Sequence, residues 1–106
     1  MTSTMNTLFK ALSHPVRREI VSMLQNGPMS SGDIAAAFDM AWPSVTGHLN
    51  ALKEADLIEP ERAGNSIRYR LKISALEEAV GFLLGVVEPA SEKMRGATRK
   101  LKRRTT

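Results

Sequence analysis

The sequence predicts a mainly α-helical domain that carries one two-stranded β-hairpin. Two observations predict it. Within residues 31–56, apolar side chains recur at helical spacing in two successive short runs. Within residues 67–73, apolar and basic side chains alternate, which is typical of a strand that buries one face. The 106 residues make one domain of ordinary size. A chain this short buries a limited share of its surface, which favours an oligomer with a shared core.

The first elements are expected to be two helices. Residues 1–6 are polar and we expect them to fray, whereas residues 7–12 place apolar side chains at helical spacing and predict a short helix. Pro15 is expected to open the next helix, because the first helical turn tolerates a missing N–H. Ser13 or His14 would cap that helix. We expect His14 to cap or pack rather than to bind a metal, since no second ligand lies nearby in the sequence.

The stretch of residues 31–56 predicts two short helices joined by a tight turn, and Ser30 or Ser31 is expected to cap the first of them. In the second, over Pro43–Ala55, the apolar residues Val45, Leu49 and Leu52 form one stripe. The outer face carries small or hydrogen-bonding side chains and no acid, namely Trp42, Ser44, Thr46, Gly47, His48 and Asn50. Such a face fits the DNA major groove, where base edges present donors and acceptors. The pattern therefore indicates a helix-turn-helix with Pro43–Ala55 as its recognition helix, although such helix pairs also occur in many all-α domains.

Two positions weaken this recognition helix locally. Ala41, at its expected cap, offers no side-chain acceptor, at a cost of roughly 1 kcal/mol. Gly47, inside the helix, costs about another 1 kcal/mol relative to Ala. We therefore expect that tertiary packing, rather than local propensity, holds the recognition helix in place.

A β-hairpin is expected next, with strands over Ile58–Arg62 and Ile67–Ile73 and a turn over residues 63–66, in which Gly64-Asn65 can adopt positive φ. The second strand has one apolar face and one wholly basic face. A hairpin alone is marginal, so its apolar face should lie on the helices. The basic face would then point outward beside the recognition helix and contact phosphates; a merely solvated face is the alternative. The expected DNA contacts of the hairpin are Arg62, Asn65, Arg68 and Arg70.

The last expected helix covers residues 75–87. Ser74 and Glu77 form a capping box, and the helix that follows has an apolar stripe broader than the flank of one domain needs. Such a surface suggests burial against a second copy of the chain. The predicted dimerisation residues are Leu8, Phe9, Leu76, Val80, Leu83, Leu84 and Val87. Pro89 should kink or end this helix.

Charge divides the chain near Pro89 into a domain over residues 1–88 and a basic tail over residues 89–106. The net charge of the chain is +4, yet from Lys93 onward there are seven basic residues and no acid, and the remainder has a net charge of −3. Basic tails bind the phosphate backbone through counterion release. They also serve as solubilising ends, and both interpretations stay open.

Several functional classes find no support in the sequence. Without cysteine, the chain lacks disulfides, thiolate metal sites and cysteine catalysis, which fits a cytoplasmic protein. No apolar run approaches the roughly 20 residues of a membrane span, and no secretory signal is apparent. No Ser/His/Asp arrangement, pair of acids in a plausible pocket or phosphate-cradling glycine loop indicates an enzyme. We expect no catalytic site, no metal and no cofactor.

Taken together, residues 8–87 resemble a small bacterial ArsR-type transcriptional regulator. Two correctly spaced segments carry the resemblance. They are Ala-Leu-x-x-Pro-x-Arg-Arg over residues 11–18 and Pro-x-Val-x-x-His-Leu-x-x-Leu over residues 43–52. The resemblance implies a winged helix-turn-helix, with the hairpin as the wing. It also implies a homodimer joined through the first and last helices, recognition helices in successive major grooves, and repression by covering a promoter.

The chain departs from the metal-sensing members of that family. The positions that correspond to their cysteine pair are Ser30 and Gly32, and the last helix offers Glu77, Glu78 and Glu88 but no histidine. We therefore expect no metal sensing through these ligands, and the chain is more similar to the small subgroup without metal ligands. Gly47 stands where the family often has a long polar side chain, so one base contact would be missing.

Two hypotheses follow. In the first, the chain is a homodimeric, sequence-specific repressor of double-stranded DNA, in which Ser44, Thr46 and His48 contact the groove, with Trp42 and Asn50 at its edge. In the second, the fold is a protein-interaction module whose tail binds nucleic acid without specificity. The sequence names no operator and no small-molecule effector.

Overall fold

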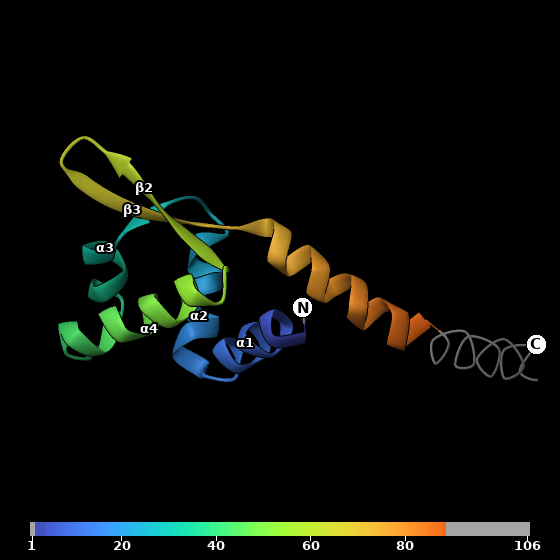
Figure 1. Cartoon of the computed structure of the whole chain (residues 1–106). Helices are drawn as coiled ribbons and strands as arrows, with labels where there is room; N and C mark the ends of the chain where they lie inside the picture. The colour runs from blue at the N-terminus through green and yellow to red at the C-terminus, as the bar shows by residue number, and fades with distance from the viewer. Residues whose placement is uncertain (1, 89–106) are drawn as a thin grey trace, which may run out of the picture. The chain divides into compact units, whose positions relative to one another are not determined.

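The computed structural model describes residues 2–88, and its elements follow the predicted order (Figure 1). They are α1 (Thr2–Leu12), α2 (Pro15–Leu24), β1 (Met29–Ser30), α3 (Ser31–Ala36), α4 (Trp42–Glu54), β2 (Ile58–Ala63) and β3 (Ser66–Leu71), followed by helical residues 73–88. The chain forms two compact units, one that reaches to Leu76 and one that begins at Glu77. The mainly α-helical fold class is confirmed.

The first helix is longer than predicted. It begins at Thr2, so the expectation that residues 1–6 fray is wrong for residues 2–6. The reason lies in the apolar spacing, because Met5 continues the stripe of Leu8 and Leu12 by one more turn. Met5 and Leu12 are half-buried and Leu8 is buried.

Local signals set the starts of α2 and α3 as expected. His14 caps α2 by accepting a hydrogen bond at Nδ1 from the Val16 N–H at 3.3 Å. Ser30 caps α3, with its Oγ accepting from the Asp33 N–H at 3.1 Å. Ala41 stands at the cap of α4 and makes no side-chain cap bond, so α4 depends on its packing, as the sequence predicts.

A buried apolar core fixes α4 within the first unit. The largest fully buried side chains are Ile20, Ile34, Val45, Leu52, Leu57 and Ile58, and α4 packs against α1, α2, α3 and β2. The C-terminus of α4 is closed by two backbone bonds, from Asp56 N to Lys53 O at 3.0 Å and from Leu57 N to Leu52 O at 3.0 Å. This is the Schellman arrangement, in which the residue after the cap is left-handed. Here that residue is Asp56, with φ +62°.

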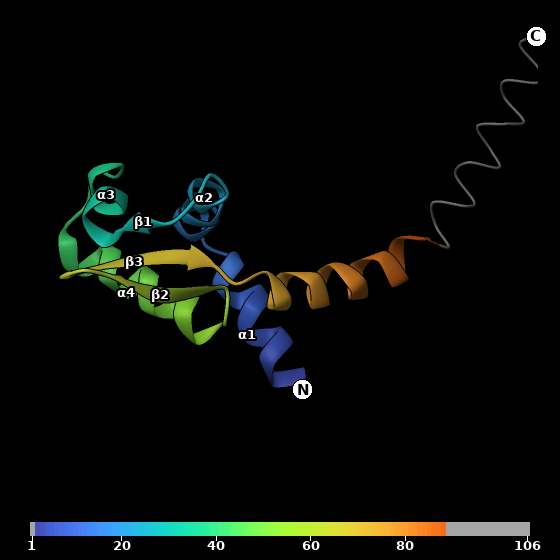
Figure 2. The same ribbon diagram turned by 90° about the horizontal axis from the view of Figure 1, so that it is seen from above.

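The sheet has three strands rather than the two expected. Its order is β1-β3-β2, with β1 antiparallel to β3 through Met29 opposite Tyr69. β2 and β3 form the hairpin, and Ile58 lies opposite Leu71. The tight turn is formed by two residues, of which only Gly64 has positive φ, at +64°. Figure 2 shows the hairpin running alongside α4, with its turn at the end where α4 begins.

The strand-to-helix junction also differs from the expectation. β3 ends at Leu71 rather than at Ile73. The Lys72 N–H still donates to the Leu57 carbonyl at 2.9 Å, one step beyond the pair of Ile58 with Leu71 and in the same register. Residue 73 is already helical, so Ser74 lies inside the first turn and not at the cap of a capping box.

The last helical residues carry a row of exposed apolar side chains. Val80, Phe82, Leu83, Leu84, Val86 and Val87 are between 45% and 60% exposed. The basic tail predicted over residues 89–106 and the predicted effect of Pro89 lie outside the described residues. None of the helices that the structure describes has the length and apolarity needed to cross a lipid bilayer.

Candidate nucleic-acid interface

α4 is anchored by one face and leaves the other open. Val45 and Leu49 are each 2% exposed, whereas all of the predicted outer-face residues except His48 are exposed, namely Trp42, Ser44, Thr46, Gly47 and Asn50. The structure therefore brings the side chains predicted for the recognition helix to one accessible face, opposite the buried stripe.

The exposed indole of Trp42 marks the start of this face. Trp42 is 55% exposed, and its Cη2 atom would lie 3.9 Å from a Cβ built on Gly32 in α3. A large aromatic ring at this position, with more than half of its surface in solvent, is unusual for a side chain that only supports the fold. Trp42 therefore belongs to the open surface at the α3–α4 turn.

His48 differs from its neighbours because it lies half-buried between α4 and the start of α2. Its Nδ1 accepts a hydrogen bond from Arg17 Nε at 3.2 Å. Its ring centroid lies 4.4 Å from that of His14, with an interplanar angle of 55°. Burial foremost, and then the neighbouring His14 and Arg17, lower the pKa of His48 below its usual value, so this ring is neutral at about pH 7.

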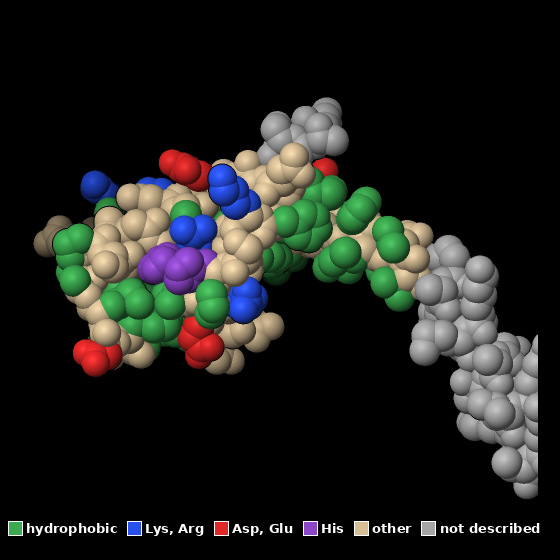
Figure 3. Space-filling model, turned by 90° about the horizontal axis from the view of Figure 1, so that it is seen from below, with side chains coloured by type: hydrophobic (Ala, Val, Ile, Leu, Met, Phe, Trp, Pro, Cys, Tyr) green, Lys and Arg blue, Asp and Glu red, His purple; other side chains and the backbone are tan. Residues whose placement is uncertain are grey.

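The sequence did not indicate that His14 and Arg17 would join His48. Arg17 and His48 are 31 residues apart, and no local pattern links them. In Figure 3 the two histidines form one patch on the face that carries α4, with cationic side chains beside it.

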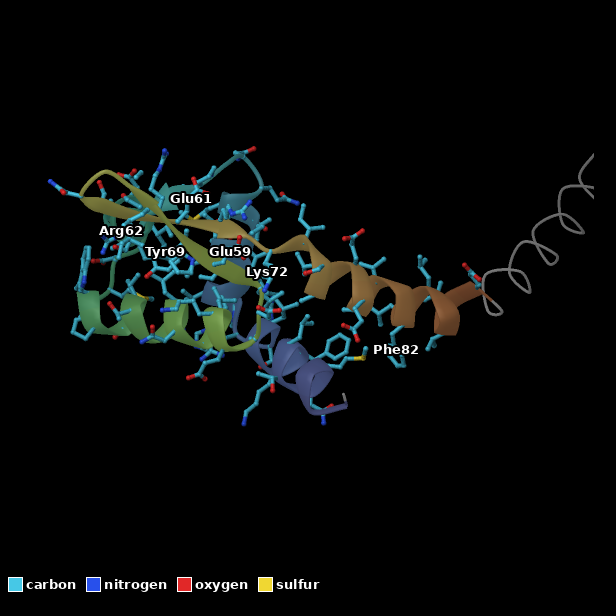
Figure 4. All side chains as sticks on the ribbon, turned by 45° about the horizontal axis from the view of Figure 1, so that its top comes forward. Glu59, Glu61, Arg62, Tyr69, Lys72 and Phe82 are labelled. Carbon is cyan, nitrogen blue, oxygen red and sulfur yellow. The ribbon has the colours of Figure 1, made fainter. Side chains whose placement is uncertain are left out.

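The wing has a mixed face where a wholly basic one was expected. The hairpin register places Glu59 opposite Arg70 and Glu61 opposite Arg68, and directly opposed residues share a face. Arg70 forms an ion pair with Glu59 and a second with Glu61 at 3.4 Å. Arg68 Nη2 donates to the Pro28 carbonyl at 3.2 Å. The basic alternation of β3 is therefore partly neutralised by Glu59 and Glu61 of β2, which are labelled in Figure 4.

Arg62 lies on the opposite face of the hairpin from these pairs. It is opposite Ile67 in the register, near the turn that contains Asn65, and all three residues are exposed. Within residues 2–88, Arg62 forms no ion pair. Of the predicted wing residues, Arg62 and Asn65 are thus the ones whose side chains have no ion-pair or hydrogen-bond partner among the described residues.

The predicted dimerisation residues differ in exposure. Leu8 is 2% exposed, so it is a core residue of this chain and not part of an open surface, contrary to the expectation. Phe9 is 37% exposed and Leu76 is half-buried. The remaining four are about half exposed, namely Val80, Leu83, Leu84 and Val87.

Across the described residues, no group of three or more His, Asp or Glu side chains is placed to hold a metal ion.

Comparisons with known proteins identify the family. A family model described as a helix-turn-helix domain matches residues 12–61. The transcriptional repressor SdpR of Bacillus subtilis is 41% identical over 83 residues, which cover 78% of this chain and 92% of SdpR. A solved ArsR-like transcriptional regulator from a Rhodococcus species is 25% identical, with a TM-score of 0.73 over 94% of this chain and 93% of that one. The chain belongs to the ArsR family of transcriptional regulators.

A second solved structure extends the comparison within the ArsR family. It is a Mycobacterium bovis protein described as a homodimeric winged helix-turn-helix DNA-binding domain and a possible ArsR-family regulator. It is 27% identical to this chain, with a TM-score of 0.64, and the alignment covers 90% of this chain and 85% of that one. The winged helix-turn-helix predicted from the sequence is confirmed by this likeness.

Proposed function

We propose that this ArsR-family chain is a homodimer that binds a specific DNA sequence and represses transcription there. The observation that carries the proposal is the open face of α4, which presents hydrogen-bonding side chains and no acid among its predicted contacts. A helix exposed in this way enters the major groove and reads base edges. We assign Ser44, Thr46 and Asn50 to base edges and Trp42 to the rim of the contact. Gly47 allows close approach of the backbone.

The wing would follow the phosphate backbone beside that groove. Arg62 and Asn65, at the exposed end of the hairpin, are assigned to phosphate or minor-groove contacts, which position a protein on DNA. Arg68 and Arg70 supply two further cations once phosphate oxygens replace the Pro28 carbonyl and the two glutamates.

A dimer would present two copies of α4 to successive major grooves. The half-exposed apolar residues of the last helix support it, because soluble monomers rarely expose such contiguous apolar surface. The similar Mycobacterium bovis domain is described as homodimeric, and SdpR as a repressor. We assign Phe9, Leu76, Val80, Leu83, Leu84 and Val87 to the interface.

A gel shift with the DNA upstream of the chain's own gene tests specific binding. Excess random duplex is added as competitor, and the complex should persist. Thr46→Ala should lose about tenfold in affinity for the upstream DNA while its affinity for random duplex is kept. Ser22→Ala, which removes an exposed hydroxyl from α2, is the matched control and should bind as the parent does. Complete loss of the complex to random competitor would instead favour the protein-interaction hypothesis.

Sedimentation analysis tests the dimer. The parent chain should sediment as a dimer, and Leu84→Glu should sediment as a monomer, because a charge would be buried in an apolar interface. Glu78→Gln changes an exposed residue of the same helix and should leave the dimer intact. A monomeric parent would remove the basis for two recognition helices in one complex.

A further inference from the structure

The two histidines beside α4 share one hydrogen-bonding pattern. Nδ1 of His14 accepts from the Val16 N–H, and Nδ1 of His48 accepts from Arg17 Nε. A neutral imidazole has one acceptor and one donor nitrogen. These bonds therefore assign the proton of each ring to Nε2, so that each ring offers an N–H donor on its outer side.

Both of these donors are at least partly accessible to solvent. Among the described residues, the Nε2 atoms of His14 and His48 have no hydrogen-bond partner, and neither atom is fully buried. Arg17 uses only Nε to bind His48, so the rest of its guanidinium offers further N–H donors. Three neighbouring side chains thus present donors and no acceptor, which is the complement of an anion.

The surrounding charges favour an anion as well. Arg17 of α2 and Lys10 of α1 line a groove of about 520 Å³ beside α4, together with Glu54, so this groove carries two cations and one carboxylate. Of the cluster, only Arg17 lines it. Two groups at the start of α2 face His48, namely His14 at the cap and Arg17 in the first turn. Burial is the largest cause that lowers the pKa of His48, and these two groups lower it further. No carboxylate among the described residues contributes to the titration of His48.

We propose that His14, Arg17 and His48 together bind one backbone phosphate of the DNA at the edge of the groove that α4 enters. This inference rests on the proposed function of α4. The cluster lies where α2 meets the flank of α4 and not on the outermost face, and the flank of a helix in the major groove faces the phosphate backbone rather than the base edges. His48 therefore positions the protein, which revises the expectation that it contacts the groove floor.

A phosphate at this cluster would couple DNA binding to protons. The free protein holds His48 neutral, whereas a phosphate next to the ring favours the imidazolium. Between the lower pKa of the free chain and the higher pKa of the complex, binding takes up a proton. Affinity for DNA therefore rises as the pH falls, and it does so equally for specific and random sequences, because every duplex supplies the same phosphate.

The experiment measures the affinity of the full chain for its upstream duplex and for a random duplex of equal length by fluorescence anisotropy. Measurements run from about pH 8 to about pH 6 at constant ionic strength. The parent chain should gain about threefold to tenfold in affinity for both duplexes over this range. His48→Asn keeps an acceptor for Arg17, and His14→Asn keeps the cap on α2. Both variants lose the Nε2–H of the imidazole and the ability to take up a proton in this pH range. Each variant should bind both duplexes about threefold or more weakly at low pH and show a flatter pH profile.

Arg18→Gln is the matched control, since Arg18 is exposed and its Nη1 donates to the Leu12 carbonyl at 2.9 Å, away from the cluster. It should keep the pH profile of the parent. Unchanged pH profiles in both histidine variants, or losses confined to the upstream duplex, would overturn the phosphate assignment. Free inorganic phosphate should compete only weakly with either duplex. Saturation of the DNA-free chain by micromolar inorganic phosphate would indicate a site for a free anion instead, and would also overturn the assignment to the DNA backbone. If the parent fails to prefer its upstream duplex, the proposed function fails, while the random duplex still tests the phosphate site.

Discussion

Glu59 faces Arg70 across β2 and β3, and the two side chains form an ion pair. Glu61 binds the same guanidinium, and the side chain of Arg70 is still 52% exposed. Exposed ion pairs contribute little to stability, about 0–1 kcal/mol. Under the proposed function the pairing matters more for DNA binding than for the fold, because the two glutamates would compete with phosphate for the guanidinium of Arg70.

Neutralising both glutamates tests whether the wing approaches the backbone. Glu59→Gln with Glu61→Gln should raise affinity for random duplex by about threefold or more and steepen the salt dependence by about one unit, since Arg70 becomes available. Glu77→Gln with Glu78→Gln removes the same charge from exposed positions outside the wing and is the control. Equal gains in the two double variants would mean that only net charge matters.

Gly47 should be replaceable with a gain in stability. No atom lies within 4 Å of a Cβ built at this position, so Gly47→Ala meets open space inside α4. The substitution should raise the free energy of unfolding by about 1 kcal/mol, measured in urea. Gly64→Ala is the contrasting variant, because φ is +64° there, and it should lower the free energy by about 1 kcal/mol. A loss of stability in Gly47→Ala would contradict the open surface described for α4.

Asp56 holds the left-handed position that ends α4 and also binds Lys72, whose Nζ lies 2.8 Å from Asp56 Oδ1. Replacing it by Gly or by Ala removes the same ion pair, so the comparison isolates the backbone. Asp56→Gly should be more stable than Asp56→Ala by about 1 kcal/mol in urea unfolding. Equal stabilities would show that the left-handed conformation is not maintained in solution.

The pKa of His48 predicts how stability depends on pH. Burial, His14 and Arg17 hold this pKa below its ordinary value of 6.5, so the unfolded chain takes up a proton at a pH where the folded chain does not. The stability that His48 contributes is therefore present above pH 6.5 and declines as the pH falls below it. His48→Gln should remove this part of the pH dependence of the urea midpoint. A constant difference between parent and variant from about pH 7.5 to about pH 5 would argue against it.

Local signals in the sequence were sufficient for the helix-turn-helix. Pro15, Ser30 and the spacing of Val45, Leu49 and Leu52 predict α2, α3 and α4 because each acts within one or two helical turns. The open face of α4 follows from the same spacing. These features require no knowledge of distant partners.

Features that depend on pairing between distant segments were not predicted. β1 has two residues and no pattern of its own, and it exists because Met29 pairs with Tyr69. The expected turn over residues 63–66 already implies the register that brings Glu59 to Arg70, but the prediction of a wholly basic face considered the second strand alone and not its cross-strand neighbours. The contact of Arg17 with His48 joins two helices 31 residues apart, and no local periodicity reports it.

The most direct test of the central claim is a selection of duplexes from a random-sequence pool by the full chain. Two copies of α4 held by one dimer should select a palindrome whose half-sites lie about one helical turn, or 10–10.5 base pairs, apart. Enrichment of a single half-site, or of no common sequence, would contradict a homodimer that reads DNA with paired recognition helices.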